Sequence, residues 1–212
     1  YGRKRGRKPS VRQEALLKDL LPRVAVDLTA PVGQRQETFL EIGFGGAEHL
    51  IWQAERNPGI AFLGCEPFED GVIKALTAIA DKGLGNIHLH ADDARPLLRA
   101  LPKASIGRVF ILFPDPWPKR KHQKRRLVSP ATLALLARIM KPGAELRVAT
   151  DIGDYARSTL IAIRAEPRFH WTATSPQDWR ERPTDWPGTR YEAKGLREGR
   201  RCYYFRFERV PG

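Results

Sequence analysis

The chain has 212 residues, 42% of them hydrophobic, and 37 lysines and arginines against 24 aspartates and glutamates give a formal net charge of +13. That length suits one domain with a real core, and an ordinary hydrophobic share excludes wholesale disorder. No apolar run approaches the roughly 18 residues of a membrane helix, so we expect no membrane association. The excess of positive charge favours a polyanionic partner such as nucleic acid.

Cys65 and Cys202 are the only cysteines, and neither belongs to a Cys-x-x-Cys or Cys/His cluster. Such isolated cysteines support neither a disulfide framework nor a zinc site. A basic N-terminus with no apolar stretch after it also lacks the pattern of a secretory signal. We therefore expect reduced, buried thiols, no metal and a cytoplasmic location.

Residues 1–9 read YGRKRGRKP, a composition that predicts a flexible basic arm ahead of a single domain at 10–212. Ser10 followed by Gln13 is typical of a capping box that opens a short helix. We expect Pro22 to end this helix. Leucines at helical spacing form its apolar face: Leu16, Leu17, Leu20 and Leu21.

From residue 38 onward, short apolar runs alternate with helical patterns. Five strand–helix units in succession predict a parallel sheet with helices on both faces. The expected strands are 38–43, 60–66, 86–92, 108–114 and 144–151, and the expected helices are 47–56, 68–80, 94–101, 129–140 and 155–165.

The tail breaks this alternation, because residues 169–175 and 200–210 are strand-like and the Trp- and Pro-rich segment 175–188 between them shows no helix. We expect an antiparallel hairpin at one edge of the sheet. The fold class predicted is α/β: a doubly wound Rossmann-like sheet, mostly parallel, with an antiparallel C-terminal edge strand.

In such sheets ligands bind beyond the carboxyl ends of the strands. The first strand leads into a turn in which Gly43 and Gly45 allow the backbone to approach a ligand at the start of a helix. Glu66 closes the second strand, where a carboxylate can receive the hydroxyls of an adenosine ribose. This pair fits a dinucleotide as well as any other adenosyl cofactor, and a purely structural turn is the alternative.

Two carboxylates favour S-adenosylmethionine, which carries a sulfonium and an ammonium but no phosphate. Glu48 replaces the third glycine of a dinucleotide fingerprint, where it would repel a pyrophosphate. Glu41 before the glycines likewise suits a cationic ligand. After the third strand, Asp93 can accept from the adenine amine, although a helix N-cap explains it equally well.

The fourth strand leads into FPDPWPKRKHQKRR, residues 113–126. Alternate prolines make the loop stiff and hold Asp115 beside Trp117, as recognition of an extruded base requires. The basic run that follows favours a phosphate track. Asp151 after the fifth strand and the segment 189–192 can add polar contacts, with a helix cap and a turn as their structural alternatives.

Other functions remain open at this point. A methyltransferase acting on an amino group of adenine or cytosine would usually carry two adjacent prolines, which Asp115 separates here. A non-catalytic RNA-binding domain would not need the carboxylates at successive strand ends. None of the five histidines is assigned a catalytic role.

Together, GRKRGRK, EIGFGG, Glu66, Asp93-Ala94, FPDPWPKRKHQKRR, ATD and TRYE closely resemble the bacterial tRNA (guanine-N7)-methyltransferase family over nearly the whole chain. The FPDPW motif with its basic run is highly specific, whereas the glycine loop is not. Ala47 stands where many members have a further glycine. The resemblance implies an S-adenosylmethionine-dependent enzyme that methylates N7 of a guanine in the tRNA variable loop. For the oligomeric state we expect a monomer or a homodimer, and the sequence does not distinguish them.

The resemblance also implies roles for individual residues. Asp115 would be catalytic and would contact the cofactor together with Glu41, Gly43, Gly45, Glu66 and Asp93. Substrate contacts would come from Lys119, Asp151, Thr189, Arg190, Tyr191 and Glu192. The residues facing RNA would be Lys121, His122, Gln123, Lys124, Arg125 and Arg126.

Overall fold

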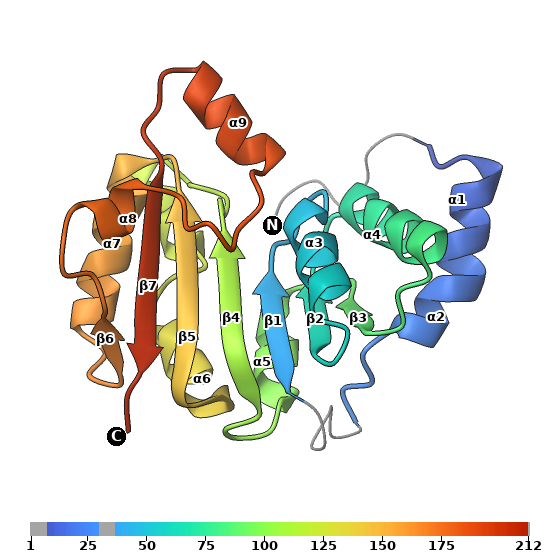
Figure 1. The fold of residues 1–212 in the computed structure, drawn as a ribbon, viewed down its shortest axis with the longest axis horizontal. Coiled ribbons are helices and arrows are strands. Elements are labelled where there is room, and N and C mark those ends of the chain that lie inside the picture. The colour runs from blue at the N-terminus through green and yellow to red at the C-terminus, as the bar shows by residue number, and fades with distance from the viewer. Residues whose placement is uncertain (1–7, 30–36, 212) are drawn as a thin grey trace. The chain divides into compact units, whose positions relative to one another are not determined.

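The computed structural model describes residues 8–29 and 37–211, so most of the predicted basic arm lies outside the described residues. Among the residues it describes, no helix is long and apolar enough to cross a membrane. The chain divides into two compact units, residues 1–102 and 103–212 (Figure 1).

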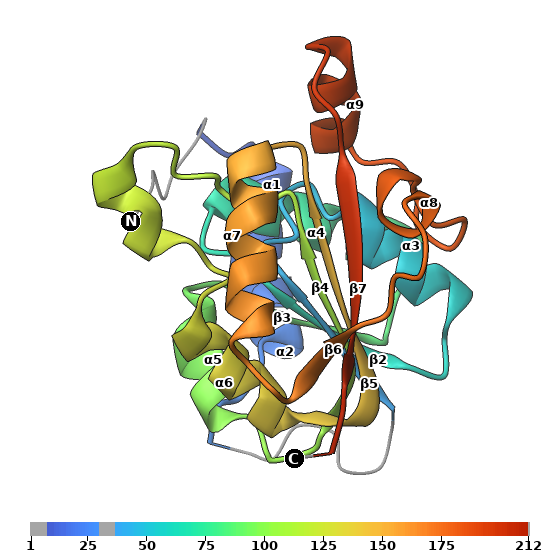
Figure 2. The ribbon, with the colours of Figure 1, turned by 90° about the vertical axis from the view of Figure 1, so that its left-hand side faces the viewer.

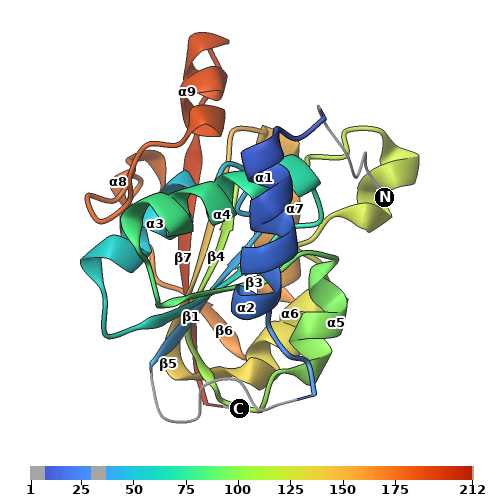
Figure 3. The ribbon, with the colours of Figure 1, turned by 90° about the vertical axis from the view of Figure 1, so that its right-hand side faces the viewer.

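The first unit opens with a helix in three parts, α1 (Val11–Ala15), the π-helical turn η1 (Leu16–Leu20) and α2 (Leu21–Val24). The Ser10–Gln13 capping box is confirmed. The prediction that Pro22 ends the helix is wrong, because Pro22 lies in the first turn of α2, where its missing N–H costs little. The four leucines pack against the core, and Figure 3 shows α1 lying beside α4.

The three strands of the first unit are parallel in the order β3-β2-β1, with Leu40 opposite Leu63 and Leu63 opposite His88. Figure 1 draws α3 and α4 in front of these strands and α5 behind them, as predicted for helices on both faces. The elements are β1 (Thr38–Ile42), α3 (Glu48–Arg56), β2 (Ala61–Cys65), α4 (Glu69–Lys82), β3 (Ile87–His90) and α5 (Ala94–Ala100).

The second unit has the strand order β4-β5-β7-β6. The β4 and β5 strands are parallel, and β7 is antiparallel to both β5 and β6, so the C-terminal strand lies inside the order and the three-residue β6 is at its end. The elements are β4 (Ile106–Leu112), the 3₁₀ turn η2 (Arg120–Arg125), α6 (Pro130–Ile139), β5 (Met140–Thr150), α7 (Gly153–Arg164), β6 (Phe169–Trp171), α8 (Gln177–Arg180), α9 (Arg190–Arg197) and β7 (Tyr203–Arg209).

Alternation along β5 and β7 gives the second unit two different faces. Val148 pairs with Phe205 on the apolar face that α6 and α7 cover, while Arg147 pairs with Arg206 on the opposite face. Figure 2 shows α7 and α8 on opposite sides of these strands. The expectation of no helix between β6 and β7 is wrong, since both α8 and α9 lie there.

Gly64 of β2 is a position where the core leaves no room for a side chain. A Cβ there would lie 2.7 Å from Leu50 Cδ2 and 2.9 Å from Phe44 Cδ1, whereas a Cβ at Gly85 meets nothing within 4 Å. We expect Gly64→Ala to lower the free energy of unfolding by about 1–3 kcal/mol through overpacking. Urea denaturation measures this, with Gly85→Ala as the matched control. Equal stability of the two variants would contradict the packing argument.

Candidate functional site

The turn after β1 depends on left-handed backbone conformations. Gly43 and Gly45 have φ values of 78° and 54°, which glycine adopts without strain. Ala47, the N-cap of α3, has φ of 64° and is fully buried. A non-glycine residue in this region is strained by roughly 1 kcal/mol, and burial of the Ala47 methyl group offsets part of that.

Glu66, directly after β2, holds this glycine turn in place. Its Oε2 accepts a hydrogen bond from the Gly45 amide at 2.9 Å, and its Oε1 accepts from the Phe68 amide at 2.9 Å. Gly71 in α4 completes the arrangement, because a Cβ there would lie 2.4 Å from the Gly45 carbonyl oxygen. Sequence reasoning missed Gly71, whose role depends on a close approach between the first turn of α4 and the glycine turn.

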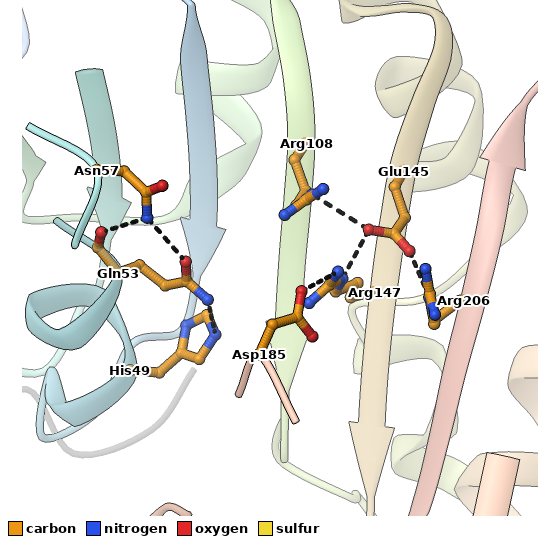
Figure 4. A network of polar contacts seen from close by, with 8 residues as sticks. All are labelled: His49, Gln53, Asn57, Arg108, Glu145, Arg147, Asp185 and Arg206. Carbon is orange, nitrogen blue, oxygen red and sulfur yellow. Dashed lines mark hydrogen bonds and ion pairs between the residues drawn. The ribbon is translucent and has the colours of Figure 1, made fainter. Parts of the chain in front are cut away.

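Glu41 lies at the end of β1 with its side chain almost wholly buried, and its Oε2 is 2.7 Å from Nδ1 of the buried His49. The other ring nitrogen of His49 is 3.3 Å from Gln53 Nε2, and Figure 4 shows His49, Gln53 and Asn57 following one another along α3. The imidazole therefore fixes the orientation of the Glu41 carboxylate. The pairing of Glu41 with His49 was also missed from the sequence, although both residues flank the glycine turn.

Asp93 is the N-cap of α5, which is the structural role that the sequence offered as an alternative to contact with adenine. One carboxylate oxygen accepts from the Arg95 amide at 2.8 Å, and the other pairs with the Arg95 guanidinium at 2.7 Å. Its side chain is about one-third exposed. Nearby, the Cys65 thiol donates to the Asp92 carbonyl, and burial together with the charge of Glu66 raises its pKa, as expected of an inert core thiol.

The segment after β4 has a strained backbone in addition to the three prolines that the sequence shows. Phe113 and Trp117 have φ values of 50° and 42°, which bulky residues rarely adopt. Between them Asp115 is exposed. Its carboxylate makes no hydrogen bond or ion pair with any residue that the structure describes, so the loop presents this carboxylate to solvent.

The basic run forms the 3₁₀ turn η2, which packs on Trp117. The Arg125 guanidinium lies 4.9 Å from the centre of the Trp117 ring, and the His122 ring meets that ring edge-on at 5.9 Å. Lys119, Lys121, Lys124 and Arg125 are exposed, as a phosphate-binding surface requires. Gln123 instead turns inward and donates to Asp154 Oδ2 at 3.2 Å.

The prediction that the whole segment 121–126 faces RNA is wrong for Arg126, because this residue is buried. Only 4% of this residue is exposed, so its guanidinium has no surface to offer a phosphate. It donates to the Pro116 carbonyl at 3.0 Å and to Ser158 Oγ at 2.8 Å, and it pairs with Asp154. Arg126 therefore ties the proline-framed loop to the first turns of α7.

Asp151, after β5, is held by α9 and the chain that follows it. Its Oδ2 accepts from Arg200 Nε at 2.7 Å, and its side chain is 15% exposed. Gly195 permits this contact, since a Cβ there would lie 2.7 Å from the same oxygen. The N-cap of α7 is Ile152, so the cap alternative for Asp151 is not the one observed.

Thr189 and Glu192 form the capping box of α9: the Thr189 hydroxyl accepts from the Glu192 amide at 3.2 Å, and Glu192 Oε2 accepts from the Thr189 amide at 3.3 Å. Glu192 is buried and also pairs with Arg182 and Tyr204. The proposed substrate segment thus divides into two structural residues and the exposed pair Arg190 and Tyr191.

Five charged side chains gather on the second unit's face away from α7 (Figure 4). Glu145 lies 3.1 Å from Arg108, 2.7 Å from Arg147 and 2.5 Å from Arg206, and Arg147 also binds Asp185 at 2.7 Å. Arg147 is fully buried. The residues of this network are far apart in the sequence and form no motif, so the network could not be predicted from the sequence.

Among the residues described, no cluster of His, Cys, Asp and Glu could hold a metal ion. The candidate ligand-binding groups are carboxylates, backbone amides of the glycine turn and exposed cations. Glu41, Glu66 and Asp93 come from three neighbouring parallel strands of the first unit, as predicted, while Asp115, Asp151 and the basic run belong to the second.

Comparisons with known proteins identify the class. A family model described as "Putative methyltransferase" matches residues 35–205. The crystal structure of the 16S rRNA methyltransferase KamB covers 84% of this chain and 90% of its own, with a TM-score of 0.60 and 19% identity. The [4+2]-cyclase SpnF covers 97% of this chain and 84% of its own at a TM-score of 0.58 and 16% identity. The Rossmann-like, mostly parallel fold class is confirmed, and the matched family is that of a methyltransferase.

Two relatives narrow this class. The tRNA (guanine-N(7)-)-methyltransferase of Rhodospirillum rubrum is 45% identical over 100% of this chain and 88% of its own length. That of Ruegeria pomeroyi is 47% identical over 100% of this chain and 94% of its own. The chain belongs to the family of tRNA (guanine-N(7)-)-methyltransferases, as the sequence motifs predict.

The charge network makes stability depend on pH. Burial raises the pKa of Glu145, but the guanidiniums of Arg147, Arg206 and Arg108 outweigh it and hold this pKa below its usual range. Because the lowered pKa belongs to the folded state, the stabilisation is complete above the unfolded pKa of about 4.3 and is lost as the pH falls through the folded value.

We expect Glu145→Gln to lower the unfolding free energy at pH 7 by about 1–3 kcal/mol and to flatten its decline below pH 4.5. Urea titrations between pH 3 and pH 7 measure both effects. Glu181→Gln removes an exposed carboxylate of the same unit and is the control. A parallel decline in both variants and the wild type would show that Glu145 is not the group responsible.

Proposed function

We propose that this protein transfers the methyl group of S-adenosylmethionine to N7 of a guanine in the variable loop of tRNA. Full-length identity of 45–47% to enzymes named for this reaction carries the proposal. A tRNA substrate also accords with the net charge of +13. The proposed site of action is the cytoplasm. The alternative of a non-catalytic RNA-binding domain is less well supported, because such a domain would have no role for the carboxylates at the strand ends.

The first unit offers groups that suit S-adenosylmethionine. Carboxylate oxygens carry more than one lone pair, so Glu66 can accept from ribose hydroxyls while it binds the Gly45 amide. Glu41, oriented by His49, suits an ammonium group, and Asp93 suits the adenine amine. The Gly43 and Gly45 backbone leaves room for a ligand to approach closely.

Guanine N7 has an in-plane lone pair and carries no proton, so methylation of it needs no strong general base. S-adenosylmethionine supplies an electrophilic methyl group on a positively charged sulfur. The purine becomes cationic as N7 attacks, and an anchored carboxylate stabilises that charge. Asp115 is the proposed carboxylate because prolines frame it, it is exposed and it pairs with no described residue.

The exposed groups of the second unit are the proposed RNA and substrate contacts. Lys121, Lys124 and Arg125 of η2 would bind phosphates, with His122 beside them on Trp117. Lys119, Arg190 and Tyr191 are exposed and able to contact the substrate directly. Asp151, Thr189 and Glu192 would act there through the chain segments they hold.

Incubation of the protein with unmodified tRNA and methyl-labelled S-adenosylmethionine, followed by nucleoside analysis, tests the reaction. We expect label in 7-methylguanosine. For Asp115→Ala we expect kcat to fall by about 100-fold or more while cofactor affinity stays within a few-fold. Label in another nucleoside would refute the guanine assignment, and near-normal turnover of the variant would refute the role of Asp115.

The phosphate contacts are tested separately by the salt dependence of tRNA binding. We expect Lys121→Gln and Lys124→Gln each to weaken binding and to reduce the slope of log K against log salt by about 0.9. Lys74→Gln, on the exposed side of α4, is the control of equal charge change. An unchanged slope in the η2 variants would remove these lysines from the interface.

A further inference from the structure

Resting on the proposed function, we infer that Arg126 is a positioning residue for Asp115: it fixes the proline-framed loop from within and does not bind tRNA. The resemblance places Arg126 with the RNA-facing residues, but the geometry separates it from them. Arg126 alone of the basic run is buried, whereas five residues that precede it are exposed, namely Lys119, Arg120, Lys121, Lys124 and Arg125.

The contacts of Arg126 join three backbone segments. Its Nε donates to the carbonyl oxygen of Pro116, the residue directly after Asp115, at 3.0 Å. On the other side its guanidinium donates to Ser158 Oγ at 2.8 Å and to the Asp154 carbonyl at 3.4 Å, and pairs with the Asp154 carboxylate. One planar group thus spans the distance from the Asp115 loop to α7.

Tyr155 fixes the far end of the same segment. Its ring lies 5.2 Å from the Arg126 guanidinium, and its hydroxyl accepts a hydrogen bond from the Val128 amide at 3.2 Å. The ring is fully buried, and burial raises the pKa of Tyr155 to about 12, so the hydroxyl stays neutral across the physiological range. The first turns of α7 therefore hold both the Pro116 end and the Val128 end of the loop.

These contacts stabilise a loop whose own backbone conformation is unfavourable. With Phe113 and Trp117 both at positive φ, the segment needs outside contacts to keep this shape. Asp115 itself has no hydrogen bond among the described residues, so its position depends on the neighbouring peptide that Arg126 binds. A shift of about 1 Å in a reacting group can reduce a rate by 100-fold.

Arg126→Lys is the variant that tests this inference, because it keeps the charge and the number of tryptic sites but lacks the planar fork that reaches several acceptors at once. Asp154→Asn is the second variant, and its side chain is 61% exposed, so folding is not at risk. Arg157→Lys, on the exposed side of α7, is the matched control.

On each protein we would measure the rate of tryptic cleavage within residues 119–125 and the steady-state rate of tRNA methylation. We would also measure the affinity for tRNA and the slope of log K against log salt. For Arg126→Lys we expect cleavage to accelerate at least 5-fold and kcat to fall at least 10-fold, with tRNA affinity and salt slope within 2-fold of wild type. Asp154→Asn should change in the same direction by less, and Arg157→Lys should match wild type.

Loss of tRNA affinity and a shallower salt slope with normal kcat would make Arg126 a phosphate ligand and overturn the inference. Faster cleavage with normal kcat would overturn the link to Asp115. If the wild-type protein methylates no guanine, the proposed function fails by itself, and an unchanged cleavage rate of Arg126→Lys would then separately refute the role of Arg126 in holding the loop.

Discussion

The loops after the strands contain partly buried backbone N–H and C=O groups that no helix or strand pairs, and such groups need partners. Side chains supply them here. Glu66 accepts from the amides of Gly45 and Phe68, Asp93 accepts from that of Arg95, and Arg126 donates to the carbonyl of Pro116. The positions of the glycine turn and of the loops that carry Asp93 and Asp115 depend on bonds of this kind.

One consequence is that structural and functional roles coincide in the same residues. An N-cap and a cofactor-binding carboxylate are often treated as competing explanations, yet Asp93 is a cap with about a third of its side chain exposed. Glu66 likewise keeps lone pairs after accepting two backbone hydrogen bonds. Because both are already oriented before any ligand arrives, a ligand that binds them loses less free energy to ordering of the site.

Regular periodicity explains which parts of this fold were predictable from the sequence. The five strand–helix units follow from alternating apolar runs, and the glycine turn and the exposed Asp115 follow from short motifs within single loops. The helix past Pro22 was missed because a π-helical turn resets the hydrogen-bonding pattern first. The α9 helix was not predicted because the prolines before it suggested an irregular segment. Thr189 and Glu192, which have the spacing of a capping box, were the signal that could have predicted it.

The pairing of Arg126 with Asp154 and that of Glu41 with His49 could not be read from spacing, because each joins separate elements. Burial of an arginine is unfavourable unless its donors find partners, which makes Arg126 unexpected within a basic run. Its partners here are a carboxylate, a hydroxyl and two carbonyls, and the loop it binds has two bulky residues at positive φ, each strained by about 1–3 kcal/mol. The desolvation of one cation and the strain of the loop are therefore linked, since the same hydrogen bonds that satisfy the guanidinium keep the backbone of the Asp115 loop in its strained form.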